Sequence, residues 1–312
     1  MNNAMEQRAK EFRPVSFRGK IQVVATSGPF DKQIFNAGLS FLKQNKLRPW
    51  YDTAAYARTG YLAGDAEHRA AQFLKAYADP DVEAIWAARG GYGALQLLPL
   101  LEPHVAELKK TPKTLIGFSD VTILHSFLIE KCGMVTIHGP NITTLEQLDH
   151  HSKNQITRLV QGKNEAFRIG DSHIRPLQLG TAKGTVKGGN LATLASLLGT
   201  PWEPDLDGCI LLLEEVGEVP YRVDRLITQL RLAGKFAKIK GLIIGDCSYK
   251  ESHPPVEKQV DARMIVERSG IDAKIPVMSE FPVGHGDKNM AFLLGATATM
   301  DTEARTLSYH LG

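Results

Sequence analysis

Short apolar runs alternate with helix-like segments through the first part of the chain. The runs at residues 21–25, 82–88 and 113–118 have the length and composition of buried strands. Residues 65–78, rich in Ala, Leu and charged side chains, predict a helix, and the apolar spacing of 121–128 predicts another. Strands that alternate with helices indicate a parallel sheet covered on both faces.

The same alternation starts again in the second half. Apolar runs at 209–213, 242–245 and 275–278 predict strands, and three-and-four spacing of apolar residues predicts helices over 191–198 and 223–230. The second half therefore predicts a further α/β unit.

Between about residues 142 and 182 the pattern degrades into polar sequence with few apolar positions. Such a stretch predicts a linker with one short helix. We therefore expect an N-terminal α/β domain over residues 1–150, a linker over 151–182 and a C-terminal domain over 183–312.

A serine stands at the junction of a predicted strand and a predicted helix. Ser119 follows Gly117-Phe118, and a turn of this kind holds a nucleophile clear of the sheet, above a helix N-terminus. Val121 occupies the position of the second glycine in the usual Gly-x-Ser-x-Gly pattern, and most serines at such turns cap a helix. The segment alone leaves catalysis and capping open.

Two further acid–base candidates follow predicted strands. Glu214 comes directly after the run at 209–213, and His285 lies between two glycines beyond the run at 275–278. Serine, carboxylate and histidine in this order match α/β-hydrolases, in which histidine takes the serine proton and the carboxylate orients the imidazole. Four other residues stay open for these roles: Glu215 and Glu218 for the carboxylate, His125 and His138 for the base.

The glycine-rich segment Arg89-Gly90-Gly91-Tyr92-Gly93 follows a predicted strand. It matches neither a dinucleotide-binding nor a Walker pattern. Without side chains, its backbone N–H groups can approach a ligand closely, and one of them could form an oxyanion hole with the N–H of Asp120. A tight turn that requires positive φ explains the glycines equally well.

Composition narrows the class of protein. The net charge is only +3, and Lys and Arg are spread along 312 residues, so we expect no nucleic-acid or membrane surface. No run is long enough for a membrane span, and the first ten residues lack the apolar core of a secretory signal. The three isolated cysteines show neither metal nor disulfide spacing, which fits a reducing cytoplasm.

Taken together, these segments resemble the LD-carboxypeptidase family, which includes bacterial muramoyltetrapeptide carboxypeptidases and microcin C self-immunity peptidases. The likeness covers nearly the whole chain. The glycine-rich loop and the serine motif that follows it are specific when they occur together. The segments that carry it are Ala25-Thr26-Ser27-Gly28-Pro29, Gly60-Tyr61-Leu62-Ala63-Gly64, Arg89-Gly90-Gly91-Tyr92-Gly93, Gly117-Phe118-Ser119-Asp120, Gly188-Gly189-Asn190-Leu191, Gly199-Thr200-Pro201-Trp202, Leu213-Glu214-Glu215 and Gly284-His285-Gly286.

The resemblance implies a fold and a set of roles. An N-terminal parallel sheet, like that of flavodoxin or class I glutamine amidotransferases, would carry Ser119 on a nucleophile elbow, and a C-terminal mixed α/β domain would carry Glu214 and His285. The triad would close across the domain interface, which makes relative domain position a control on activity. The oxyanion hole would come from the backbone of Gly91 and Asp120, with no metal or organic cofactor.

Two positions depart from the family pattern. Phe118 replaces the more usual tyrosine, and Thr26 replaces a proline. We expect neither side chain to touch a catalytic atom, so that both bear on substrate detail rather than on reaction type.

The implied activity is that of a cytoplasmic serine peptidase that releases D-alanine from the L,D-peptide bond of murein tetrapeptide in peptidoglycan recycling. A microcin-type amide between an amino acid and a nucleotide-like group is the alternative substrate. Relatives of that type carry extra loops with aromatics that stack on a base, whereas Trp50, Trp86 and Trp202 here fall in predicted strands or turns. A non-catalytic ligand-binding module is a second alternative, and the resemblance leaves a homodimer open.

Overall fold

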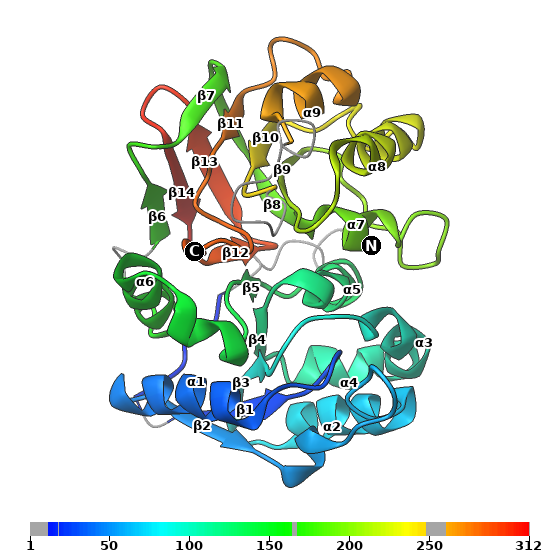
Figure 1. Ribbon diagram of the computed structural model, residues 1–312, viewed down its shortest axis with the longest axis vertical. Coiled ribbons are helices and arrows are strands. Elements are labelled where there is room, and N and C mark those ends of the chain that lie inside the picture. Colours follow the sequence, from blue (N-terminus) through cyan, green and yellow to red (C-terminus); the bar gives the residue numbers. More distant parts are fainter. Residues whose placement is uncertain (1–11, 18, 164–166, 248–259, 312) are drawn as a thin grey trace, which may run out of the picture.

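The computed structural model describes residues 12–17, 19–163, 167–247 and 260–311. Two α/β units are stacked one above the other, with the N-terminal sequence in the lower unit of Figure 1 and most of the C-terminal sequence in the upper one. This arrangement confirms the predicted two-domain α/β fold.

The first sheet, among the described residues, has six strands in the order β12-β5-β4-β3-β1-β2. The neighbours from β5 to β2 pair in parallel, and the β12–β5 pair is antiparallel. Its strands are β1 (Lys20–Val24), β2 (Arg48–Tyr51), β3 (Val82–Ala87), β4 (Thr114–Gly117), β5 (Thr136–His138) and β12 (Phe292–Leu294).

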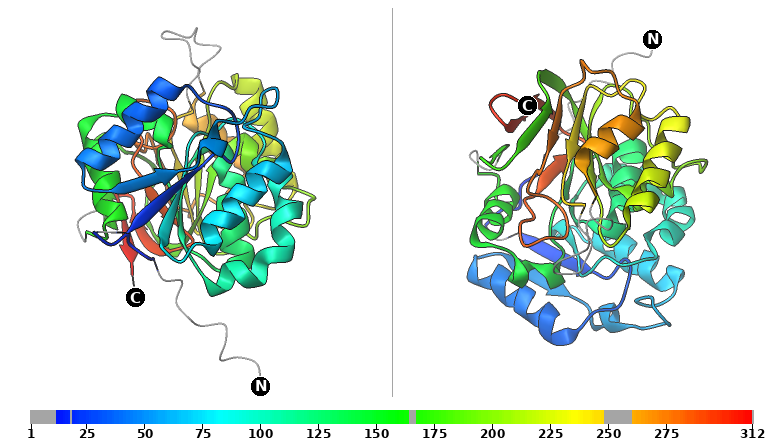
Figure 2. Two further views of the ribbon diagram at one scale, coloured as in Figure 1. Left: turned by 90° about the horizontal axis from the view of Figure 1, so that it is seen from below. Right: turned by 45° about the horizontal axis from the view of Figure 1, so that its top comes forward.

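Helices cover both faces of this sheet (Figure 2). One face packs Val23 and Trp86 against Phe35 and Leu39 of α1. The opposite face packs its strands against the remaining helices in a second apolar cluster. The helices are α1 (Lys32–Gln44), α2 (Ala66–Ala78), α3 (Leu98–Leu101), α4 (Val105–Lys110) and α5 (Thr122–Cys132).

The second sheet, in the same described part of the chain, has eight strands in the order β6-β14-β13-β8-β9-β10-β11-β7. Its central strands β8 to β11 are parallel, and antiparallel strands extend both edges. The strands are β6 (Arg168–Gly170), β7 (Arg175–Gln178), β8 (Thr181–Asn190), β9 (Cys209–Glu214), β10 (Gly241–Ile244), β11 (Val277–Ser279), β13 (Thr297–Asp301) and β14 (Thr306–His310).

Within the described part of the chain, three helices pack against one face of the second sheet. They are α7 (Leu191–Ala195), α8 (Pro220–Leu232) and α9 (Ala262–Ser269). Their apolar side chains form a cluster with alternate residues of the strands, such as Leu211 and Leu213. The other face shares its apolar cluster with the first domain, so the two units are joined by a continuous core.

The segment predicted as a linker is largely regular structure. Helix α6 (His150–Val160) supplies the expected helix, and strands β6 and β7 lie at the two edges of the second sheet. Both strands are largely exposed or half-buried, which explains why their sequence is as polar as that of a linker. The domain boundaries at 150 and 182 stay predictions.

Strand β12 joins the two halves of the chain. It belongs by sequence to the C-terminal half, yet Phe292 pairs with His138 of β5 in the first sheet. The adjoining Ala291 is held by Gln155 of α6, whose side chain accepts from its N–H at 2.9 Å and donates to its carbonyl at 3.0 Å. The loop that carries His285 is thus tied to the N-terminal sheet a few residues after that histidine.

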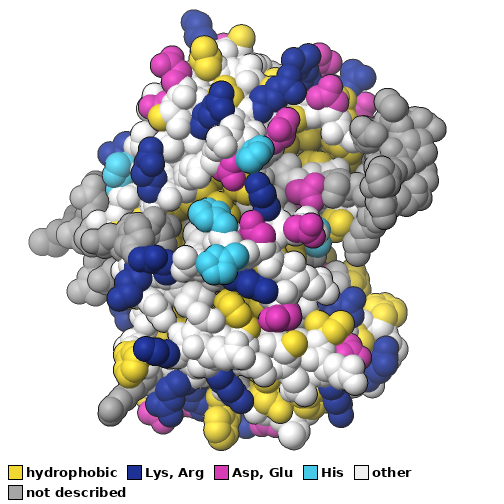
Figure 3. Space-filling model, turned by 60° about the vertical axis from the view of Figure 1, so that its left-hand side comes forward, with side chains coloured by type: hydrophobic (Ala, Val, Ile, Leu, Met, Phe, Trp, Pro, Cys, Tyr) yellow, Lys and Arg dark blue, Asp and Glu magenta, His cyan; other side chains and the backbone are white. Residues whose placement is uncertain are grey.

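The surface carries charges of both signs. On the face drawn in Figure 3, described Lys and Arg side chains are interspersed with Asp and Glu. Within the described ranges, no helix is long and apolar enough to cross a membrane.

Candidate active site

Ser119 lies at a sharp turn between strand and helix. Strand β4 ends at Gly117, a single turn of 3-10 helix covers Ser119–Val121, and α5 follows at once. Ser119 has φ +66°, a left-handed conformation that an L-residue adopts only at a cost of about 1–3 kcal/mol. The strained turn carries the serine at the carboxyl edge of the sheet, as the elbow interpretation predicts.

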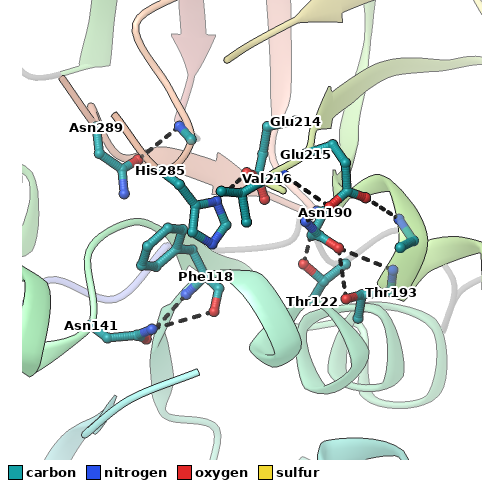
Figure 4. Close-up of polar contacts among 12 residues, drawn as sticks. Phe118, Thr122, Asn141, Asn190, Thr193, Glu214, Glu215, Val216, His285 and Asn289 are labelled. Carbon is teal, nitrogen blue, oxygen red and sulfur yellow. Dashed lines mark hydrogen bonds and ion pairs between the residues drawn. The ribbon is translucent and has the colours of Figure 1, made fainter. Parts of the chain in front are cut away.

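Asn141 supports the turn from the segment that follows the neighbouring strand β5. Its Oδ1 accepts from the Phe118 N–H at 3.3 Å, and its Nδ2 donates to the Phe118 carbonyl at 3.5 Å (Figure 4). A Cβ on Gly117 would lie 2.9 Å from that Oδ1 and 3.0 Å from the Ala87 Cβ. The glycine two residues before Ser119 is therefore required by close packing.

The glycine-rich loop lies directly against the serine. A Cβ on Gly90 would come within 2.9 Å of Ser119 Cβ and 3.2 Å of its Oγ. The Gly90 carbonyl accepts from the N–H of Gly28 at 3.1 Å, and Gly91 has φ +115°. The glycines therefore serve both as a turn with positive φ and as a backbone surface facing the serine.

Asp120 directs its side chain away from solvent. The carboxylate is buried, and its Oδ2 accepts from the Ala94 N–H at 2.8 Å. Burial raises the pKa of Asp120, which hydrogen bonds from Ser27 and Ala94 oppose. Its backbone N–H belongs to the first turn of a helix, where N–H groups have no partner inside the helix.

Glu214 and His285 form a direct pair. Glu214 ends strand β9 and is fully buried, and its Oε2 lies 2.8 Å from His285 Nδ1 (Figure 4). The His285 ring packs on Phe118 with ring centroids 4.6 Å apart, so the expectation that Phe118 touches no atom of the predicted catalytic residues is wrong. A carboxylate only accepts, so it holds the proton of the neutral imidazole on Nδ1 and leaves Nε2 as an acceptor.

The loop around His285 is held by its own contacts. Gly284 has φ +132°, and a Cβ there would lie 2.9 Å from the Asp246 Cβ. Its N–H donates to Asn289 Oδ1 at 3.3 Å, and the Asn289 N–H donates to Ser152 Oγ in α6 at 3.1 Å. The glycine before His285 is thus fixed by conformation and packing.

A cavity of about 560 Å³ brings Ser119 and His285 to one surface. Gly90 and Gly91 line it as well. The other lining residues are Phe30, Asp31, Ile34, Arg89, Phe118, Asn141, Thr143, Thr144, Gln147 and Val216. A larger cavity, of about 720 Å³, is lined by none of the predicted site residues.

The alternative residues have other partners. The Glu215 carboxylate accepts from the N–H groups of Ala192 at 2.7 Å and Val216 at 2.8 Å, and Glu218 pairs with Arg222. Ala192 lies in the first turn of α7, so Glu215 caps a helix.

The two alternative histidines are fully buried and do not line the cavity. The Nε2 of His125 lies 2.8 Å from the Gly117 carbonyl. Burial lowers the pKa of His125 to about 4 and also lowers that of His138. Both rings are therefore neutral at pH 7.

Asn141 is a residue that the sequence interpretation missed. It follows strand β5 by three residues, and the carboxyl ends of parallel strands are where such sites gather. That position was the available signal. No group of three or more His, Cys, Asp or Glu side chains within the described residues has the arrangement of a metal site.

Comparison with known proteins identifies the family. The model described as LD-carboxypeptidase N-terminal domain matches residues 21–139, and the one described as LD-carboxypeptidase C-terminal domain matches residues 183–300. The murein tetrapeptide carboxypeptidase of Pseudomonas aeruginosa is 31% identical over 91% of this chain and 93% of its own.

Two solved structures share the fold. The muramoyltetrapeptide carboxypeptidase of Oxalobacter formigenes, 28% identical, superposes with a TM-score of 0.79 over 93% of this chain and 97% of its own. The protein MccF in complex with glutamyl sulfamoyl guanosine, 21% identical, gives 0.85 over 96% of this chain and 98% of its own. At that identity the second likeness concerns the fold alone.

Proposed function

This chain belongs to the LD-carboxypeptidase family, and we propose that it is a serine L,D-carboxypeptidase that removes D-alanine from murein tetrapeptide. The observation that carries the proposal is the pairing of His285 with buried Glu214 beside a cavity that also exposes Ser119 on a strained turn. Family membership supports a peptidase, and these three side chains supply a nucleophile, a base and an orienting carboxylate.

In the proposed reaction Ser119 Oγ attacks the carbonyl carbon of the residue before D-alanine while His285 Nε2 takes the hydroxyl proton. The oxyanion accepts hydrogen bonds from the N–H groups of Gly91 and Asp120. Collapse of this intermediate breaks the peptide bond, and protonated His285 gives its proton to the D-alanine amine. Water then attacks the acyl-enzyme with His285 as base, which releases the tripeptide and restores Ser119.

The lining of the cavity suits a peptide with a free carboxylate. Among the described residues that line the cavity, the only lysine or arginine is Arg89, and its side chain is exposed. Its Nη1 donates to the Pro29 carbonyl, which orients the guanidinium at the edge of the site. We propose that Arg89 binds the carboxylate of the terminal D-alanine, since guanidinium is suited to carboxylate recognition.

The microcin-type substrate is the second candidate. A nucleotide-like group needs an aromatic surface for stacking, and the only Phe, Tyr or Trp side chains among the described residues that line the cavity are those of Phe30 and Phe118. None of the three tryptophans lines the cavity: Trp86 is buried in β3, Trp50 lies on edge strand β2, and Trp202 donates to Glu102 at 2.6 Å. This placement, together with the 31% identity to a murein tetrapeptide carboxypeptidase, favours the murein substrate.

The test is mass spectrometry of murein tetrapeptide, and separately of processed microcin, after incubation with the protein. We expect loss of one D-alanine with wild type and none with Ser119→Ala or His285→Ala. Cleavage of processed microcin alone would move the assignment to the immunity-type substrate. Cleavage of neither by folded wild type, with no labelling of Ser119 by a fluorophosphonate, would favour a non-catalytic binding module.

We also propose that the protein acts in the cytoplasm, where recycled tetrapeptide would be found, and that it forms a homodimer. Cell fractionation and light scattering of the purified protein test these two statements. Recovery of the protein outside the cytoplasm, or a monomer at micromolar concentration, would contradict them.

A further inference from the structure

Arg69 is a buried cation beside the proposed active site that the reaction does not use. It lies on α2, and its side chain is among the largest fully buried ones of the described residues. Burial lowers the pKa of its guanidinium, and the nearby negative charge of Asp120 opposes this. Burying a guanidinium costs free energy unless its N–H donors are hydrogen-bonded, so its acceptors indicate which parts of the structure it stabilises.

Those partners are backbone carbonyls of the loops around the site. Nη1 donates to the carbonyls of Thr26 and Gly93, each at 2.8 Å, and Nε donates to the Gly64 carbonyl at 3.2 Å. Nη2 donates to Gln96 Oε1 at 2.6 Å. One planar group thus connects the loops that follow β1 and β3 with the loop that precedes α2.

The Gly93–Ala94 peptide is held from both sides. Its carbonyl accepts from Arg69 Nη1, and its N–H donates to Asp120 Oδ2. Gly93 has φ +125°, and a Cβ there would lie 2.5 Å from Arg69 Nη1, so the close approach of the guanidinium requires a glycine. Gly91 lies two residues before this peptide.

We infer that Arg69 is a positioning residue for the oxyanion hole. Through the Gly93–Ala94 peptide it connects the glycine-rich loop to Asp120, so that the N–H groups of Gly91 and Asp120 keep a fixed spacing. This inference rests on the proposed function, because that function assigns those two N–H groups to the oxyanion. Loss of the guanidinium should lower transition-state stabilisation and leave ground-state peptide binding nearly unchanged.

The test compares Arg69→Met with Lys113→Met. Lys113 is a second buried cation of the same domain, whose Nζ donates to the carbonyls of Asp79 and Val82 at the other end of the sheet. Burial also lowers the pKa of Lys113, so the two variants lose comparable buried cations. Neither Lys113 nor the two residues to which its Nζ donates line the cavity.

Two readouts separate positioning from general destabilisation. The first is kcat and KM for tetrapeptide. The second is the rate at which a fluorophosphonate labels Ser119, followed by intact mass, because the tetrahedral phosphorus adduct places an oxygen in the oxyanion hole. For Arg69→Met we expect kcat and the labelling rate to fall by about 10²–10³, the usual effect of losing one oxyanion donor, with KM within threefold. For Lys113→Met we expect both rates within threefold of wild type.

Gln96→Leu provides a milder variant if Arg69→Met does not fold. It removes the acceptor of Arg69 Nη2 and leaves the loop peptides intact, so we expect a roughly tenfold fall in both rates. The inference is overturned if folded Arg69→Met, or Gln96→Leu in its place, keeps wild-type rates. The inference is also overturned if Lys113→Met lowers kcat and the labelling rate as much as Arg69→Met does, or if Arg69→Met changes KM rather than kcat.

The labelling readout also distinguishes this inference from the proposed function. Wild type that is labelled but does not release D-alanine would contradict the proposed substrate, and the comparison of labelling rates would still decide the role of Arg69. Wild type that is not labelled at Ser119 would overturn both.

Discussion

Replacing Glu214 with Gln perturbs the carboxylate–imidazole pair while the side chain at position 214 keeps nearly the same size. Glu214 is fully buried, and its Oε2 lies 2.8 Å from His285 Nδ1. The carboxylate only accepts, so it fixes the proton of the neutral imidazole on Nδ1, and in the proposed reaction it would stabilise the imidazolium. A glutamine amide also donates, which favours the wrong tautomer, and it carries no charge.

We expect Glu214→Gln to lower kcat by about 10³–10⁴, since the corresponding exchange in a serine protease triad costs about 10⁴. At 1.36 kcal/mol for each factor of ten, this is about 4–5.5 kcal/mol of lost transition-state stabilisation. The free energy of unfolding should not fall. Glu214 Oε1 has no hydrogen-bond partner among the described atoms, and a neutral amide costs less to bury than a carboxylate.

Release of D-alanine at saturating tetrapeptide gives kcat, and thermal unfolding gives stability. Glu215→Gln is the matched control, because it alters the adjacent buried carboxylate, which accepts from the N–H groups of Ala192 and Val216. We expect this variant to unfold at lower temperature and to lose less than tenfold in kcat. The reasoning is refuted if Glu214→Gln keeps kcat within tenfold of wild type, or if both variants lose the same amount.

Three further predictions concern the turn and the buried histidine. Ser119→Gly should be inactive, as Ser119→Ala should be. In urea unfolding it should be more stable than Ser119→Ala by about 1 kcal/mol, because glycine adopts φ +66° without strain. Equal stabilities of these two variants would contradict this. Gly90→Ala should fold and lose about 10² in kcat, since its Cβ would lie 2.9 Å from Ser119 Cβ, and a wild-type rate would disprove the contact. The pKa of His125 is lowered from 6.5 to about 4, so the unfolded chain binds a proton on this residue at higher pH than the native protein does. The free energy of unfolding should therefore fall by up to about 3 kcal/mol from pH 7 to pH 4. If urea unfolding of His125→Gln shows the same pH dependence as wild type, His125 is not the cause.

The fold was predictable where burial is continuous along the sequence. Strands β3, β4, β9 and β10 are buried along nearly their whole length, so their residues form uninterrupted apolar runs. Strand β12 spans only three residues, too few for a periodic signal, and its partner β5 lies about 150 positions earlier. The edge strands β6 and β7 are polar because solvent covers much of them.

The residues of the proposed site were likewise predictable only in part. Ser119, Glu214 and His285 could be proposed as site residues because each follows a recognisable strand and because their motifs resemble those of a family. Asn141 and Arg69 act on the backbone of distant loops, and no local pattern encodes such contacts. The apolar face of α2 did carry a signal, since Arg69 shares the spacing of Phe73 and Ala76, and an arginine on a buried face needs partners.

The antiparallel contribution of β12 to the first sheet has a consequence for synthesis of the chain on the ribosome. Residues 20–138 supply five of its strands, but the sixth emerges only when residues 292–294 have been made. Until then the edge of β5 has no partner and resembles the exposed edges from which strands of different molecules pair. Termination between residues 286 and 291 should therefore yield chains that contain all three proposed catalytic residues and yet aggregate rather than react.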